Sequence, residues 1–173
     1  MPRALTTAKA RDSVAWPMNR IKFVFVGELK ASWAAEASRH YLEALSRHVR
    51  CEMSLVRDAK EAKDQKTRMR KEGQALLSSL GPKDRVVGLH EQGKALGSRG
   101  LAAKLGGWLE DPGRAPCFVI GGPYGVSSEV EARFDERLSL GPYTLPHELA
   151  RVTLLEQLYR GMCILAGHPY HHG

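Results

Sequence analysis

The sequence predicts one α/β domain whose mostly parallel β-sheet is covered by helices on both faces. Strand-like runs alternate with segments of helical periodicity from residue 21 to residue 165, a pattern typical of βαβ units. Several of these runs are short and continuously apolar, as in strands that are buried on both faces. At 173 residues the chain is long enough for one such domain with a substantial core.

In the first half of the chain we expect two strands and two helices. Residues 21–26 are rich in β-formers and residues 51–55 alternate in polarity, so both runs predict strands. Between them, residues 32–48 carry apolar side chains at helical spacing. The charge-dense segment 57–72 is expected to begin a second helix, which continues to Leu80.

The second half continues the alternation. Short buried strands are predicted at residues 85–89, 117–120 and 138–140, with the polar residues 90–94 as a loop after the first of them. Ser98 is placed to cap the helix that follows this loop.

Two more helices complete the pattern. Ser128 and Glu131 have capping-box spacing for a helix that reaches Arg137. A long helix is expected at residues 146–165, because a proline suits its first turn and glycine and proline follow its end.

The charge balance favours an anionic partner. The net charge is +7 and the isoelectric point is about 9.5, so nucleic acid is the first partner to consider; a basic enzyme without a polyanionic partner is the alternative. Residues 57–72 hold seven Lys or Arg against four Asp or Glu. A nucleic-acid patch and a solvated face both fit this segment. It contains no aromatic residue, so base stacking is not indicated there.

Residues 1–20 lack apolar periodicity and carry four cations against Asp12 alone. A flexible extension, a transit peptide, and an upstream start with Met18 as the true initiator all fit this composition. The folded domain is expected to occupy residues 21–173. No apolar run approaches the roughly 18 residues that a membrane helix needs, so no membrane partner is expected.

Three loops at the carboxyl ends of predicted strands form the candidate site: residues 89–94, 121–125 and 140–146. Parallel sheets bind ligands at this edge. Gly121 and Gly122 allow a ligand to approach the backbone, but the segment lacks the G-x-G-x-x-G fingerprint of dinucleotide binding. A plain tight turn is the alternative interpretation of this glycine pair.

Other catalytic classes find little support. The histidines near the C-terminus have no neighbouring ligand pattern, so we expect no metal. The three cysteines are far apart, which favours buried thiols in a reducing compartment. No G-x-S-x-G is present. Glu156 and Arg160 have the spacing of a helix-surface pair.

Four motifs occur in order: FVIGGPYG at 118–125, LSLGPYTLPHELARV at 138–152, LLEQLYRG at 154–161 and HPYH at 168–171. Together they resemble the bacterial ribosomal RNA large subunit methyltransferase H family. The resemblance implies a single-domain SPOUT α/β knot with a C-terminal trefoil knot, over residues 21–173. It also implies a cytoplasmic homodimer that methylates N3 of a pseudouridine in 23S rRNA, within the assembled ribosome or large subunit. S-adenosylmethionine is the implied methyl donor.

The resemblance also implies site residues. The cofactor would be bound by Leu89, Gly121, Gly122, Leu140, Gly141, Pro142, Tyr143, Thr144 and Leu145. Methyl transfer to a ring nitrogen needs a general base, or cations that stabilise the deprotonated ring. The side chains of suitable type are Tyr170, His171, Arg151 and His147, with the two tail residues ranked first.

The sequence departs from the family pattern at two places. His90 stands where an acidic residue is common, and His172 and Gly173 end the chain where Arg or Lys is usual. Two rival functions stay open: a non-catalytic RNA-binding protein that has kept the fold, and a nucleotide-binding α/β enzyme. They predict, respectively, RNA binding without the cofactor and affinity for a dinucleotide or flavin.

Overall fold

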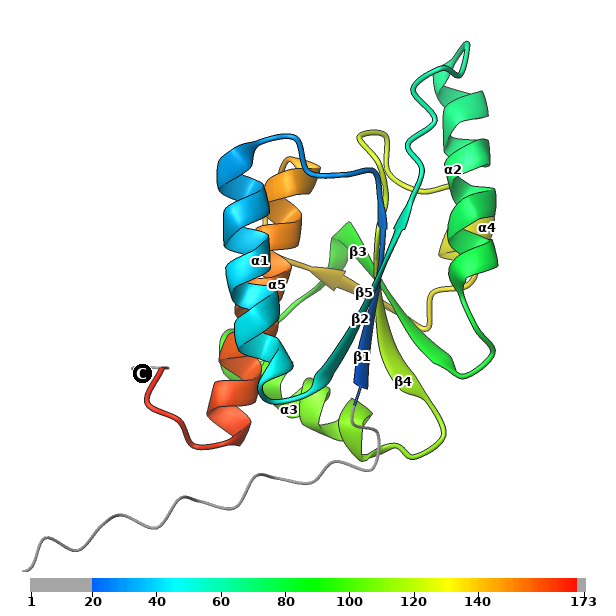
Figure 1. The fold of residues 1–173 in the computed structure, drawn as a ribbon. Coiled ribbons are helices and arrows are strands. Elements are labelled where there is room, and N and C mark those ends of the chain that lie inside the picture. Colours follow the sequence, from blue (N-terminus) through cyan, green and yellow to red (C-terminus); the bar gives the residue numbers. More distant parts are fainter. Residues whose placement is uncertain (1–19, 171–173) are drawn as a thin grey trace, which may run out of the picture.

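The computed structural model describes residues 20–170 and shows one parallel sheet between two layers of helices (Figure 1). The strand order is β2-β1-β4-β3-β5, and every strand pairs parallel to its neighbours. This confirms the predicted α/β class with a mostly parallel sheet. The strands are β1 Arg20–Val26, β2 Arg50–Val56, β3 Asp84–Ala95, β4 Ala115–Ile120 and β5 Glu136–Ser139.

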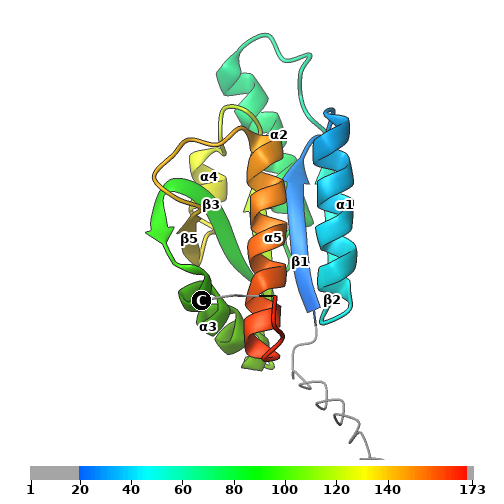
Figure 2. The same ribbon diagram turned by 90° about the vertical axis from the view of Figure 1, so that its left-hand side faces the viewer.

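The helices divide between the two faces of the sheet (Figures 1 and 2). One face is covered by α1 (Ser32–Ser46), α3 (Ser98–Glu110) and α5 (His147–Leu165). The other is covered by α2 (Gln65–Ser79) and the short α4 (Ser128–Glu131). Figure 2 shows α5 lying between α1 and α3.

The central strands form the core because they are apolar on both faces. All six residues of β4 are buried. Phe23, Phe25 and Phe118 face α1, α3 and α5, whereas Val24 and Val119 belong to the core beneath α2 and α4. Continuous apolar runs of this kind are what a doubly covered parallel sheet requires.

Four local expectations were wrong. Residues 90–94 are not a loop, because β3 continues to Ala95 with an irregularity between Leu89 and Lys94. The helix predicted up to Arg137 stops at Glu131, and β5 then begins at Glu136. The capping box is absent there, since the N-cap is a different serine whose side chain forms no cap hydrogen bond.

Ser98 also does not cap its helix. The N-cap of α3 is Gly97, and the Ser98 hydroxyl instead donates to Gln157 Oε1 on α5 at 2.8 Å. The predicted helix-surface pair of Glu156 and Arg160 is confirmed as an ion pair between successive turns of α5. For Ser98, a tertiary contact with α5 therefore replaces the local capping bond.

The terminal segments 1–19 and 171–173 fall outside the described residues. The extension predicted for residues 1–20 therefore lies there, except Arg20, which begins β1. Among the described residues, no helix is long and apolar enough to span a membrane.

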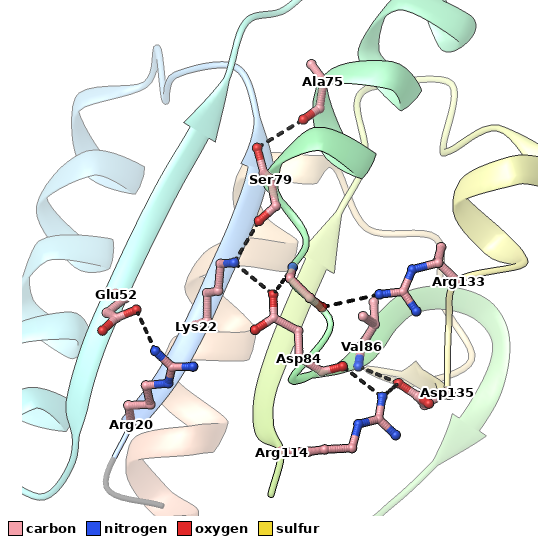
Figure 3. A network of polar contacts seen from close by, with 11 residues as sticks. Arg20, Lys22, Glu52, Ala75, Ser79, Asp84, Val86, Arg114, Arg133 and Asp135 are labelled. Atoms are coloured by element: carbon pink, nitrogen blue, oxygen red, sulfur yellow. Dashed lines mark hydrogen bonds and ion pairs between the residues drawn. The ribbon is translucent and has the colours of Figure 1, made fainter.

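A polar network ties the amino ends of three strands together (Figure 3). Lys22 Nζ on β1 donates to Asp84 Oδ2 at 2.8 Å and to the Ser79 carbonyl at 2.6 Å. The same Asp84 oxygen accepts the Gly81 N–H at 2.7 Å. Arg114 Nη2, just before β4, donates to the Asp84 carbonyl at 2.7 Å. These contacts join the end of α2 to the amino ends of the strands. The carboxyl ends of the strands are left free for a site.

Replacing Asp84 should therefore destabilise the fold. Its side chain is 4% exposed and Lys22 is 18% exposed, so Asp84→Ala leaves a largely buried ammonium group without its partner. We expect the free energy of unfolding to fall by about 3 kcal/mol. Arg50→Ala is the matched control: its pair with Glu52 is solvent-exposed, and its loss should cost less than about 1 kcal/mol. Urea denaturation of both variants measures this, and equal losses would contradict the assignment.

Candidate active site

A cavity of about 490 Å³ lies where the irregular part of β3 meets the segments after β4 and β5. Eight of the nine residues that the family resemblance implied for cofactor binding line it, and Pro142 does not. The start of α5 and Met69 of α2 complete the wall. The three segments predicted from the sequence as the candidate site are residues 89–94, 121–125 and 140–146. Residues from all three line this one cavity. Its other lining residues include His90, Glu91, Ile120, Pro123, Tyr124, Glu131, Leu138, Ser139, His147 and Ala150.

The irregular part of β3 forms one wall of the cavity. Leu138 of β5 pairs with Leu89 and again with Lys94, so the residues between them bulge out of the ladder. Gly93 is needed here, because a Cβ atom at this position would lie 2.7 Å from the backbone carbon of Leu138. The bulge places His90 and Glu91 in the cavity wall.

The two glycines after β4 are closely packed, Gly121 within its own loop and Gly122 against α2. A Cβ on Gly121 would lie 2.5 Å from the Gly125 carbonyl oxygen. A Cβ on Gly122 would lie 2.6 Å from Glu72 Oε2 of α2. Gly122 lines the cavity, but its missing side chain would point toward this carboxylate. The glycine pair therefore reflects tight loop packing as well as open access for a ligand.

Glu72 joins α2 to this loop. It is 2% exposed, and its Oε1 accepts hydrogen bonds from the Ala59 N–H at 3.1 Å and from Arg68 Nε at 2.9 Å. Arg68 also donates to Asp58 at 2.5 Å and lies over the ring of Tyr124, with 5.4 Å between the guanidinium carbon and the ring centroid. A charged cluster on α2 thus supports the residues that line the cavity.

The segment between β5 and α5 is held by short-range hydrogen bonds. The Ser139 hydroxyl donates to the Gly141 carbonyl at 2.8 Å, and Gly141 has a φ of 141°, which favours glycine. Across the cavity rim, the Thr144 hydroxyl donates to Glu91 Oε2 at 3.4 Å. Tyr143 projects into solvent, with 78% of its surface exposed.

Of the three described residues among those predicted for catalysis, His147 alone lines the cavity. Partial burial, followed by the nearby charge of Arg151, lowers the pKa of the His147 imidazole. The neutral ring that accepts a proton is therefore the dominant form at pH 7.

Arg151 lies in the core rather than in the cavity wall. It is 2% exposed, donates to the Val26 carbonyl, and places its guanidinium carbon 5.1 Å from the centroid of the Phe25 ring. Burial lowers its pKa. These contacts attach α5 to the carboxyl end of β1, so this side chain positions the helix that carries His147.

Tyr170 lies toward the other end of α5. Its ring packs on Tyr159 at 4.7 Å between centroids and beneath Arg160, and its hydroxyl donates to Glu156 Oε1 at 3.3 Å. Twelve residues separate Tyr159 from His147, which is about 18 Å along a helix axis. Burial, together with hydrogen bonding to Tyr41, raises the pKa of the Tyr170 phenol, so it keeps its proton at neutral pH. His171 lies outside the described residues.

Two carboxylates in the cavity wall were not evident as site residues from the sequence. Glu91 and Glu131 both line it, and Glu131 Oε1 is 3.7 Å from His90 Nε2. Glu91 had been placed in a polar loop, and Glu131 was interpreted as a helix cap. Among residues 20–170 no group of three His, Cys, Asp or Glu could hold a metal ion. Burial raises the pKa of Cys117 to about 12, so this thiol stays protonated at neutral pH.

The packing of Gly122 on Glu72 can be tested by a double-mutant cycle. Gly122→Ala should lower the melting temperature, because its Cβ atom meets a buried carboxylate oxygen. Glu72→Ala removes that oxygen, so the added cost of Gly122→Ala should be smaller in the Glu72→Ala background than in the wild type. Gly107→Ala is the control, since nothing lies within 4 Å of a Cβ atom there. Additive effects of the two substitutions would contradict the contact.

Comparison with known proteins places the chain in a family. It matches the model of a family described as predicted SPOUT methyltransferase over residues 19–171. It is 50% identical over 155 residues to the ribosomal RNA large subunit methyltransferase H of Solidesulfovibrio magneticus, covering 90% of this chain and 100% of that protein. The protein of the same name from Gloeobacter violaceus is 44% identical, with coverage of 89% and 99%.

Solved structures show the same fold. A probable methyltransferase from Bordetella pertussis aligns with a TM-score of 0.56 at 13% identity, covering 84% of this chain and 96% of that chain. A probable methylase family protein from Haemophilus influenzae aligns with a TM-score of 0.51 at 14% identity, covering 91% and 72%. With the family model and the full-length relatives, the comparison is decisive: the chain belongs to the ribosomal RNA large subunit methyltransferase H family of SPOUT methyltransferases.

Proposed function

We propose that the protein transfers the methyl group of S-adenosylmethionine to N3 of a pseudouridine in 23S rRNA. The observation that carries the proposal is the shared cavity: three segments implied for cofactor binding meet there, beside a neutral histidine. Family membership supplies the substrate class. The substrate would be the assembled ribosome or large subunit in the cytoplasm, because a compact basic domain recognises RNA through shape and phosphate contacts that a large surface supplies.

The cavity suits this cofactor chemically. Its volume of about 490 Å³ is in the usual range for small-molecule sites. Leu89, Ile120 and Leu138 provide apolar surface for an adenine ring. Glu91 and Glu131 provide negative charge near a ligand that carries a cationic sulfonium and an ammonium group.

The reaction needs positioning and the removal of one proton. The ring nitrogen forms a bond to the methyl carbon while the carbon–sulfur bond breaks. The electron pair of the broken bond stays on sulfur, so the sulfonium becomes a neutral thioether. The N3 proton must leave before or during this step. We assign this proton to His147, because its imidazole lines the cavity and is mainly neutral at pH 7. The Tyr170 phenol, with its raised pKa, is suited to stacking or hydrogen-bond donation instead.

A homodimer would bring the two ends of α5 into one site. Within one chain, Tyr170 contacts Glu156, Tyr159 and Arg160, far along α5 from His147. In the layer formed by α1 and α5, Trp33 and Leu149 are exposed, at 53% and 36%. A second copy packed on this layer would cover these apolar groups and present its Tyr170 to the first copy's cavity.

The first prediction concerns the general base. His147→Asn should lower the single-turnover methylation rate by roughly 10²–10⁴ while cofactor affinity stays within a few-fold. In the wild type the rate should fall with acid below the ordinary histidine pKa, since the folded-state pKa of His147 is lowered and protonation removes the base. The variant should lack this acid limb. An unchanged pH profile in the variant would exclude His147 as the base.

A chelator should have no effect on cofactor binding, because no metal is expected in the site.

The second prediction tests where Tyr170 acts. Tyr170→Ala and His147→Asn should each be nearly inactive alone. If the tail acts on the partner's cavity, a mixed dimer contains one site with both wild-type residues. Random mixing should then restore about a quarter of the wild-type activity. Light scattering that shows a monomer, or mixed protein with no recovered activity, would contradict the shared site.

A further inference from the structure

Residues 57–71 form a projecting cationic end beside the cavity, and we propose that it binds the phosphate backbone of the rRNA around the target nucleotide. This inference rests on the proposed function and names the surface that holds its substrate. Figure 1 shows the connection from β2 to α2 and the first turns of α2 extending beyond the carboxyl ends of the strands. Six of its cations are exposed: Arg57, Lys60, Lys63, Lys66, Arg70 and Lys71.

The acidic residues of this segment are largely used inside the fold. Asp58 pairs with Arg68 at 2.5 Å, and buried Glu72 pairs with the same guanidinium. Asp64 caps α2 by accepting the Thr67 N–H at 2.8 Å. The remaining acid of residues 57–72 is Glu61, which is exposed, so the outward charge is strongly positive.

The exposed cations have few partners of their own. Within residues 20–170, Arg57, Lys63, Arg70 and Lys71 form no ion pair and no side-chain hydrogen bond. The first turn of α2 contains no acidic residue, although acids there would favour the helix dipole. Stability of the helix therefore does not explain this choice of residues, whereas binding an anion does.

Aromatic rings at the cavity rim point to RNA in particular. Tyr124 is 49% exposed and Tyr143 is 78% exposed, and both line the cavity. Tyr124 lies against Arg68 of α2, so the fold supplies the aromatic side chain that residues 57–72 lack in sequence. Cations beside exposed aromatic rings are the combination that binds single-stranded RNA, through phosphate contact and base stacking.

The test compares two double variants of the purified full-length protein. Lys63→Gln with Arg70→Gln removes two cations of the projecting end. Arg50→Gln with Lys83→Gln removes two exposed cations at the amino edge of the sheet. Binding to large ribosomal subunits is measured across a salt series. The first variant should bind several-fold more weakly, and the slope of log affinity against log salt should decrease by about 1.5–2. The control variant should match the wild type.

Stacking is tested with Tyr124→Leu against Tyr124→Phe. The leucine variant should lose about five-fold or more in subunit affinity, and the phenylalanine variant should retain it. Cofactor affinity and melting temperature of the two double variants should equal those of the wild type, which separates RNA contact from damage to the fold.

Equal salt slopes for the two double variants would overturn the proposal. The proposal would also be overturned if the Lys63→Gln and Arg70→Gln variant lost binding to vesicles containing anionic lipid while its binding to subunits was unchanged. The wild-type arm reports on the proposed function separately. If that protein binds subunits through residues 57–71 but transfers no methyl group, the methyltransferase assignment fails and the binding surface stands.

Discussion

Parallel pairing at the centre of the sheet is the constraint on which the site depends. β4 lies between β1 and β3, and all six of its residues are buried. Because every strand runs in the same direction, the irregular part of β3 and the segments after β4 and β5 lie at the same end of the sheet. The cavity lies among these segments. At the opposite edge, the contacts of Lys22 and Asp84 anchor α2 to the start of the sheet.

The contact of α2 with the segment after β4 links two parts of the proposed site. Gly73 has room for no side chain, since a Cβ atom there would lie 2.6 Å from Ser127 Oγ, and Gly122 is equally close to Glu72. Arg68 holds Glu72 on one side and Tyr124 on the other. The helix that carries the exposed cations is therefore packed directly on the loop that lines the cavity. RNA bound at residues 57–71 would lie beside the methyl donor.

The length of α5 separates the candidate catalytic groups. His147 begins the helix at the cavity, Arg151 attaches the next turn to β1, and Tyr170 packs on the turns near its end. Their environments also differ, since the pKa of His147 is lowered and that of Tyr170 is raised. One side chain can accept a proton and the other keeps its own. The homodimer that would reunite them and the trefoil knot both stay predictions.

The sequence by itself determined the order and type of the elements, because apolar periodicity records which side of each segment is buried. It also identified the segments of the cavity, through ordered motifs that occur together in one family. Only the tertiary structure decided the extent of β3, the length of α4 and the place of Arg151, as each follows from contacts between distant segments. Gly122 illustrates the limit: its glycine was evident, but its neighbour Glu72, fifty residues earlier, became apparent only when the chain was folded. Local sequence encodes burial and turns, whereas close approach between distant residues depends on the packing of the whole domain.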